Sequence, residues 1–381
     1  MTVVYVERKI VLGGVLVLAL AFILGVVIGF FGKSGSEDAA GMFERLVEDK
    51  FEKEQDLVRQ ALDEVDTGKM REYHEFLTKE PHIAALKRDQ RLVEWMVDEW
   101  KASGLDNVEL ATYDMYLSWP NQSDPNKIWL KDENGEVKFE SKHKEVELRE
   151  GDDHKDFVHA FNGYAPPKDI ELSIADVIYT NYARVEDLQE LEKMGISVKG
   201  KICFARYGKI YRGNKVHNCQ TRGAIGVILF SDPNDVAIQG TDPEDVYPNT
   251  IFLPGSGIQR GSTYIGEGDP LSQLFPSVEN AYRMKPDDVE GLPKIPAQPI
   301  GYDDAKIIME KFGGRDPPEG WRGGIEGVRY ALGDGPNPDF EGWRFRLKTN
   351  NYFDTVKDSN VIGYIKGEVE PDRYVLLSNH R

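Results

Sequence analysis

The residues best suited to chemistry gather in a basic stretch of this 381-residue chain. The segment RYGKIYRGNK places four cations within ten residues and has no acidic side chain: Arg206, Lys209, Arg212 and Lys215. A glycine-rich segment further on, IQRGS, adds Arg260 and Ser262. Glycine lets a ligand approach the backbone closely, and an arginine grips a carboxylate through two charge-assisted hydrogen bonds. The pattern fits an anion-binding site or a solvated basic edge, and spacing alone does not separate the two.

A second candidate is the histidine in the final segment, YVLLSNHR. The apolar residues 374–377 predict a short strand, and His380 follows it closely. In open α/β sheets, reactive groups collect just outside the carboxyl ends of strands, and neutral histidine is the commonest metal ligand. A catalytic zinc site needs about three protein ligands. By itself, His380 therefore fits a metal ligand or a structural residue.

The basic stretch lies within a regular alternation of strands and helices. From Glu171 to about Pro233 the sequence predicts a strand (IADVIYTNYA), a helix (VEDLQELEKMG), a strand (GKICFARYG), a helical segment (Asn214–Arg222) and a strand (GVILFSD). This order is typical of a mainly parallel α/β sheet. DDAKIIMEKFGG predicts a further helix.

Further elements are predicted on either side of this core. Apolar positions at helical spacing predict one or two helices over 38–79 and another at Asp89–Ala102, which Gly104 caps. NVELATYDMYLSWP predicts a strand, and NVIGYIKGEVEPDRYVLLSNHR two strands joined by a turn. The polar residues 120–167 predict loops.

The N-terminus predicts a membrane anchor. Residues 10–32 carry no charge, and about 20 apolar residues span a bilayer core. Arg8 and Lys9 precede them, so the positive-inside rule places residues 1–9 in the cytoplasm and the rest outside. Asn121, in an Asn-Gln-Ser triplet, is then a candidate glycosylation site.

Composition argues against some classes of partner and leaves open whether the two cysteines form a disulfide. The net charge of −18 and pI near 4.9 argue against nucleic acid or an anionic membrane surface, because both attract cationic proteins. The cysteines, Cys203 and Cys219, fit a disulfide or two buried thiols.

Several long motifs make the family resemblance specific. VEWMVDEWKASGLDNVELATYDMYLSWPN, NYARVEDLQELE, GKICFARYGKIYRGNKVHNCQTRGAIGVILFSDP, LPGSGIQRG, GDPLSQLFPSVENAYR, GLPKIPAQPIGYDDAKIIMEKFGG and GEVEPDRYVLLSNHR resemble the glutamate carboxypeptidase II family. This family includes the N-acetylated α-linked acidic dipeptidases and prostate-specific membrane antigen. The likeness covers nearly the whole chain.

The resemblance implies a domain plan. It implies an α/β protein with a cytoplasmic tail (1–9), a transmembrane helix (10–32) and an incomplete co-catalytic zinc exopeptidase domain. The first part of that domain would be 40–115 and its truncated second part 355–381. Between them, 116–354 would form an inserted protease-associated, or apical, domain.

The resemblance also implies roles for particular residues. His380 matches the first zinc ligand, and Arg212 the arginine that grips the α-carboxylate of the last substrate residue. Ser262 stands where the family has an asparagine that reads the glutamate side chain, so glutamate preference is not assured. Ser272 and Phe275 stand where a threonine and a tyrosine bind calcium.

The implied function is that of a zinc metallocarboxypeptidase. Such an enzyme uses two zinc ions to release acidic, glutamate-like residues from peptides. We expect a single-pass type II protein of the plasma membrane with an extracellular ectodomain, and a homodimer when full length. The remaining catalytic residues of the family fall beyond Arg381, so this chain is expected to be inactive as it stands. The alternative is a non-catalytic binding protein like the transferrin receptors, which share the architecture but lack the zinc ligands.

Overall fold

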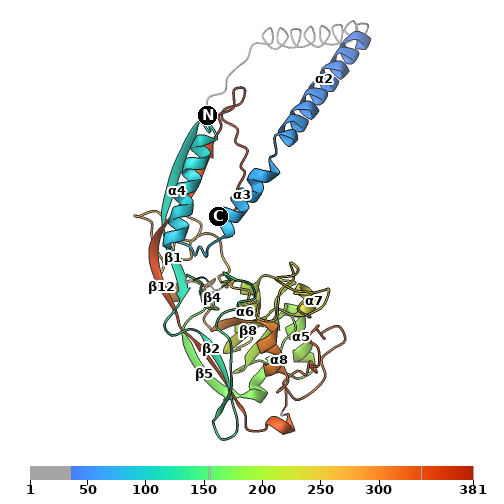
Figure 1. Ribbon diagram of the computed structural model, residues 1–381, viewed down its shortest axis with the longest axis vertical. Coiled ribbons are helices and arrows are strands. Elements are labelled where there is room, and N and C mark those ends of the chain that lie inside the picture. Colours follow the sequence, from blue (N-terminus) through green and yellow to red (C-terminus); the bar gives the residue numbers. More distant parts are fainter. Residues whose placement is uncertain (1–35, 153, 155, 336, 381) are drawn as a thin grey trace, which may run out of the picture. The chain divides into compact units, whose positions relative to one another are not determined.

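The computed structural model describes residues 36–152, 154, 156–335 and 337–380 (Figure 1). The chain divides into two compact units, Met1–Phe76 and Leu77–Arg381. Helices α2 (Ser36–Asp63) and α3 (Thr67–Thr78) confirm the helices expected at 38–79. The transmembrane helix expected at 10–32 lies outside the described residues. Among the helices that are described, none has the length and apolar character needed to cross a bilayer.

A parallel sheet forms the centre of the larger unit. Its strand order is β10-β8-β7-β6, and every neighbouring pair is parallel, as the alternation predicts. All residues of these strands are buried, which explains why they read as continuous apolar runs rather than alternating ones. The strands are β6 (Val177–Tyr179), β7 (Ile202–Arg206), β8 (Gly226–Phe230) and β10 (Ala297–Ile300).

Helices also contribute to this core. α5 (Val185–Lys193), α6 (Arg212–Gln220) and α8 (Tyr302–Met309) confirm the predicted helices, and a short α7 (Pro233–Val236) follows β8. Their buried side chains join the same hydrophobic cluster as the sheet: Leu188, Leu191, Val216, Ala305 and Ile308. Short 3₁₀ helices lie at Ile174–Asp176, Pro286–Asp288 and Pro338–Phe340.

A second, antiparallel sheet corrects the prediction for 120–167. Its order is β3-β2-β11-β5, and β2 (Lys127–Lys131), β3 (Val137–Glu140) and the short β4 (Asn162–Gly163) all fall within the expected loops. In β2, the sequence KIWLK buries two aliphatic side chains, while both flanking lysines form ion pairs at the surface. Trp129 lies on the same face as the two lysines, so the segment does not show a clean alternation of polar and apolar residues. β5 (Lys168–Ser173) and β11 (Arg344–Thr349) complete this sheet.

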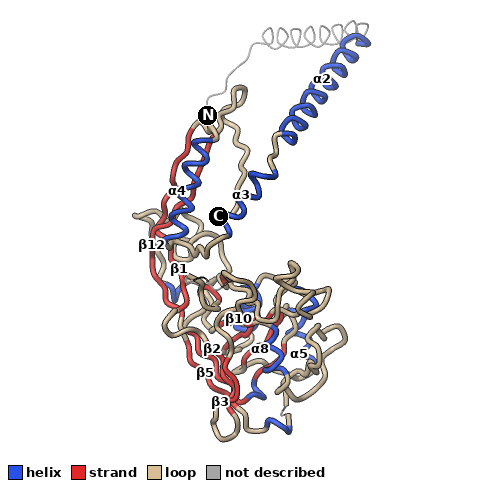
Figure 2. Tube along the Cα trace, viewed as in Figure 1, coloured by secondary structure: helices blue, strands red, loops and turns tan. Residues whose placement is uncertain are grey.

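A long two-stranded ladder pairs the two ends of the segment that is expected to be an insertion. β1 (Asn107–Pro120) pairs with β12 (Asn351–Tyr364) antiparallel along its whole length, and Tyr116 faces Thr355 (Figure 2). Helix α4 (Lys87–Ala102) contacts both strands. The boundaries expected at 116 and 354 therefore lie side by side, as an insertion requires.

The strand expected at 374–377 is wrong. After β12, residues 365–380 contain no helix or strand, and the side chains from Tyr374 to Leu377 are 74–96% exposed. A strand needs a neighbour that accepts its backbone hydrogen bonds. Among the described residues, none pairs with this segment.

The two cysteines are both buried and free, so no disulfide links Cys203 in β7 to Cys219 in α6.

Candidate functional site

The candidate site lies where a short strand pair meets the start of a helix. β4 pairs in parallel with β9 (Gly261–Ser262), and Arg212 is the first residue of α6. The Ser262 carbonyl accepts a hydrogen bond from Arg212 Nη1 at 3.3 Å and another from the Tyr211 hydroxyl at 2.8 Å. The structure thus brings together Arg212 and Ser262, both predicted site residues.

Two glycines make this close approach possible. A Cβ on Gly213 would lie 2.8 Å from the Thr263 carbonyl oxygen and 2.6 Å from the Tyr211 ring. A Cβ on Gly261, whose φ is +152°, would lie 2.5 Å from Arg212 Cζ. Real Cβ atoms do not pack at such distances, so α6 begins against β9 only because both residues lack a side chain.

Arg212 has hydrogen-bonding capacity to spare. Its guanidinium is half-buried, its Nε is buried without a partner, and its carbon lies 5.4 Å from the centre of the Tyr211 ring. An unpaired buried donor costs about 1–3 kcal/mol. The partly exposed guanidinium can also donate to a carboxylate, and the N-terminus of α6 favours negative charge. The group is therefore arranged to accept an anion.

Tyr207 and Asn162 form the wall beside Arg212, and the sequence did not point to either. The Tyr207 hydroxyl donates to the Gln259 carbonyl at 2.7 Å and accepts from Asn162 Nδ2 at 3.1 Å. Asn162 Oδ1 is buried and lacks a partner. Burial raises the pKa of Tyr207 to about 12, although Asn162 and Arg212 oppose the rise. Tyr207 therefore stays neutral at pH 7 and adds no negative charge that would repel a carboxylate.

The other cations of the basic stretch are occupied or point elsewhere. Arg206 is 2% exposed and donates to Asn181 Oδ1 at 2.5 Å. Lys215 is fully buried, and its Nζ donates to the carbonyls of Tyr182 (2.8 Å) and Gly208 (2.6 Å). Burial lowers the pKa of Lys215 to about 7. Both residues support the fold, whereas Lys209 is exposed and Arg212 contacts Ser262 of β9.

Arg260 is also committed within the protein. Its guanidinium makes two parallel hydrogen bonds to the Glu145 carboxylate, at 2.6 and 2.8 Å, and a third to the Val158 carbonyl at 2.9 Å. It therefore fixes loops in place rather than adding a free anion donor.

The other predicted site residues lie in different settings. Ser262 Oγ accepts from the Tyr264 backbone N–H at 3.1 Å, so its own proton remains for a ligand. Ser272 Oγ lies 3.3 Å from the Phe275 carbonyl oxygen, which places both proposed calcium ligands together. Asn121 Oδ1 accepts from both the backbone and side chain of Ser123. The calcium and glycosylation assignments stay predictions.

The described residues do not assemble a zinc site. His380 is exposed, and its backbone N–H donates to Asn379 Oδ1 at 2.9 Å. Within the described ranges, no three His, Cys, Asp or Glu side chains lie close enough to hold a metal. Because catalytic zinc needs about three protein ligands, His380 can supply only part of such a centre.

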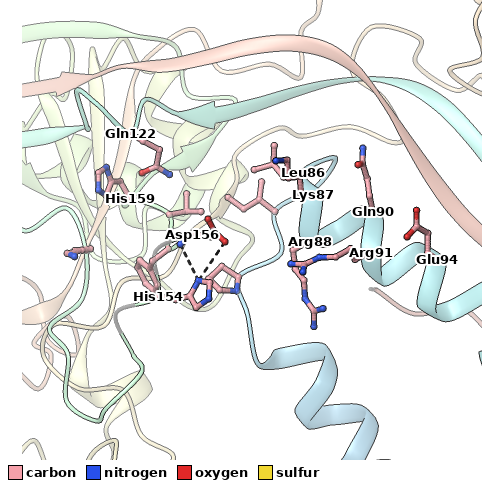
Figure 3. Close-up of a pocket in the computed structure, with 15 residues that line it drawn as sticks. Leu86, Lys87, Arg88, Gln90, Arg91, Glu94, Gln122, His154, Asp156 and His159 are labelled. Atoms are coloured by element: carbon pink, nitrogen blue, oxygen red, sulfur yellow. Dashed lines mark hydrogen bonds and ion pairs between the residues drawn. The ribbon is translucent and has the colours of Figure 1, made fainter.

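A large cavity lies elsewhere in the described part of the chain. It measures about 1220 Å³, with Arg88 and Arg91 of α4 on one wall and His154 and His159 on the other (Figure 3). His154 Nδ1 accepts from the Asp156 N–H at 3.1 Å. Volume therefore does not identify the site, since none of the predicted site residues is among the described residues that line this cavity.

Comparison with protein families and curated proteins supports the resemblance. A PA domain model matches residues 168–264, which include β5 to β9. The chain is 34% identical over 364 residues to aminopeptidase NAALADL1 of Rattus norvegicus, covering 94% of this chain and 48% of the relative. It is 34% identical over 376 residues to the glutamate carboxypeptidase 2 homolog of Caenorhabditis elegans, covering 95% and 47%. The resemblance to the glutamate carboxypeptidase II family and the presence of a PA domain are confirmed.

More distant matches complete the comparison. Transferrin receptor protein 2 of Homo sapiens is 32% identical over 277 residues, or 73% of this chain and 31% of the receptor. The solved aminopeptidase from Aneurinibacillus sp. strain AM-1 superposes with a TM-score of 0.38 at 15% identity, covering 81% of this chain and 50% of that one. The chain spans about half the length of the curated relatives that it matches over most of its sequence.

Proposed function

We propose that this relative of the glutamate carboxypeptidase II family forms the carboxylate-gripping part of a zinc metallopeptidase. The peptidase would release acidic, glutamate-like residues from the carboxyl ends of extracellular peptides. In this proposal Arg212 binds the α-carboxylate of the last residue, and the Ser262 hydroxyl contacts its side chain.

One observation carries the proposal: the half-buried Arg212 guanidinium lies at the start of α6 directly against Gly261, which has no side chain, and donates to the Ser262 carbonyl. Similarity to proteins named as a glutamate carboxypeptidase homolog and an aminopeptidase supports the reaction class. Hydrolysis itself would use zinc to activate water. His380 would provide one ligand, and the described residues alone do not provide the others.

The remaining features of the proposal follow the family. We expect the apolar residues 10–32 to anchor the protein in the plasma membrane, with the ectodomain outside the cell. Two zinc ions, a calcium ion held by Ser272 and the Phe275 carbonyl, a glycan on Asn121 and a homodimer belong to the same proposal. The resemblance supports each of them; for calcium, the Ser272 hydroxyl and the Phe275 carbonyl would replace the family's threonine and tyrosine.

A binding experiment tests the clamp on the chain as it stands. Fluorescent peptides that end in glutamate, with a free α-carboxylate or an α-carboxamide, are titrated with the 381-residue protein while anisotropy is measured. We expect the free acid to bind at least about tenfold more tightly, since charge-assisted hydrogen bonds are roughly twice as strong as neutral ones. Arg212→Ala should abolish this difference. Lys209→Ala, an exposed cation of the same stretch, is the matched control and should preserve it.

Equal binding of acid and amide would contradict the clamp. It would favour the alternative of a non-catalytic binding protein, for which the similarity to transferrin receptor protein 2 is the specific observation. A receptor of that kind has no need for a carboxylate-gripping arginine. The Arg212→Ala variant therefore separates the two functions.

A further inference from the structure

A second cavity lies between two loops of the PA-containing unit. It measures about 390 Å³ and is lined by residues from the segments 144–157 and 247–258. None of the residues to which the family resemblance gives a role lines it. Its size lies within the range of small-ligand pockets, about 300–1,000 Å³.

Two of the three acidic side chains that line this cavity, Glu145 and Asp152, already accept hydrogen bonds across it. Glu145 is held by Arg260 and by the Ile258 backbone N–H at 3.2 Å. Asp152 accepts from the Tyr247 hydroxyl at 2.6 Å and from the backbone N–H of Arg149 at 2.9 Å. These bonds tie the two loops together and leave little polar capacity for a ligand.

What the cavity offers a ligand is therefore apolar surface. Much of this surface meets solvent, because Val146 is 46%, Leu148 42% and Ile251 95% exposed. Burying exposed aliphatic side chains against a ligand is favourable. The remaining apolar lining residues are Phe157, Tyr247, Phe252, Leu253, Pro254 and Ile258.

A short segment, from Ile258 to Gly261, connects the cavity to the Arg212 site. Ile258 lines the cavity, and Gly261, three positions later, lies against the Arg212 guanidinium. Three residues span at most about 11 Å. Arg260, between them, is held by Glu145 and lies 4.9 Å from the Phe157 ring centre. A peptide gripped by Arg212 can therefore reach the cavity within about three residues of its carboxyl end.

We propose that this cavity is a subsite for an apolar side chain of the peptide, one or two residues before the carboxyl-terminal residue that Arg212 holds. The inference rests on the proposed function and narrows it to peptides that combine a free α-carboxylate with an upstream aliphatic or aromatic residue. The apolar loops contact the upstream side chain of the peptide, and Arg212 determines which residue of the peptide lies at the cavity.

Matched peptides test the subsite on the 381-residue chain. Three labelled peptides share a carboxyl-terminal glutamate: acetyl-Phe-Ala-Glu, acetyl-Ala-Phe-Glu and acetyl-Ala-Ala-Glu. We expect one phenylalanine peptide to bind about tenfold more tightly than the all-alanine peptide, which corresponds to about 1.4 kcal/mol. Val146→Ser and Ile251→Ser should remove this advantage. Both positions are exposed, so neither change should unfold the protein. Ile238→Ser, 69% exposed and outside the cavity lining, is the control and should retain the advantage.

The outcomes separate this subsite from the clamp. Arg212→Ala should weaken all three peptides, because the arginine binds the carboxylate that they share. If all peptides bind through Arg212 but phenylalanine gives no advantage, the subsite is wrong and the proposed function stands. An advantage that survives Val146→Ser and Ile251→Ser also overturns the subsite. If no peptide binds the unmodified protein even at millimolar concentration, both proposals fail.

Discussion

Gly261 lies so close to Arg212 that a Cβ at position 261 would be 2.5 Å from Cζ of the guanidinium. The same guanidinium donates to the carbonyl of the next residue, Ser262. Arg212 thus packs directly against the backbone of residue 261, and its position requires that this residue is a glycine. This contact links the glycine pattern of IQRGS to the orientation of the proposed clamp.

Gly261→Ala should displace Arg212 and weaken binding of carboxylate peptides by at least about tenfold. The added methyl group cannot share space with the guanidinium, so the arginine must leave its place on β9. Peptide anisotropy titration measures the effect, and circular dichroism verifies that the protein is folded. Gly320→Ala is the control, because Gly320 also has a positive φ, +82°, but has no atom within 4 Å of an added Cβ. Unchanged affinity in Gly261→Ala would refute the packing explanation.

Asp187→Ala should lower the free energy of unfolding by about 2–3 kcal/mol. This carboxylate is 2% exposed and accepts from the Arg184 backbone N–H at 3.0 Å and from Asn181 Nδ2 at 2.9 Å. Its removal leaves buried donors unpaired at the start of α5. Urea denaturation followed by tryptophan fluorescence gives the value. Glu186→Ala, an exposed acidic residue in the same helical turn, should change stability by less than about 0.5 kcal/mol. A comparable loss in both variants would count against the capping role.

Asp304 should make stability depend on pH between about 4 and 7. Burial raises the pKa of its carboxyl to about 6, and the carboxyl accepts from the Lys142 backbone N–H at 2.7 Å. The folded state then binds more protons than the unfolded state between pH 3.8 and 6, so this contribution is present at low pH and is lost as pH rises through 6.

Asp304→Asn cannot ionise and should escape this loss. Its stability relative to the unmodified protein should therefore rise by up to about 3 kcal/mol from pH 4 to pH 7. Urea denaturation of both proteins at the two pH values measures the change. Asp303→Asn, which removes an exposed acidic group from the same turn of α8, is the control. A stability difference that does not vary with pH would show that Asp304 is already ionised throughout.

Cys203 and Cys219 should both be found as unreactive thiols in the folded protein. Both side chains are buried, and burial raises the pKa of Cys203, which suppresses its reactive thiolate. Ellman's reagent should therefore detect almost no thiol in the native state and two per chain in guanidinium chloride without reductant. Detection of none after denaturation would mean that the cysteines are paired.

Much of the central fold could be predicted because it is encoded locally. The apolar runs of β7 and β8 and the helical pattern of α5 depend on neighbouring residues, and they define a parallel sheet before any contact is known. The antiparallel sheet was missed because β2 is short and carries Trp129 on its outer face, which hides the alternation of polar and apolar residues. The strand at 374–377 was wrongly predicted because an apolar run forms a strand only when a partner accepts its hydrogen bonds.

The sequence alone determined that Arg212 belongs to a basic, glycine-flanked stretch and that this stretch matches a peptidase family. It could not determine which cation of the stretch is available. Arg206 donates a hydrogen bond to Asn181, and Lys215 donates one to the Tyr182 carbonyl. Arg260 donates to Glu145, which lies 115 positions away in the sequence. Whether a charged side chain is satisfied depends on partners that only the folded chain brings within hydrogen-bond distance. Arg206 also keeps an unpaired Nε, but its side chain is 2% exposed, whereas tertiary structure holds Arg212 half-buried against Gly261 and Ser262 of β9.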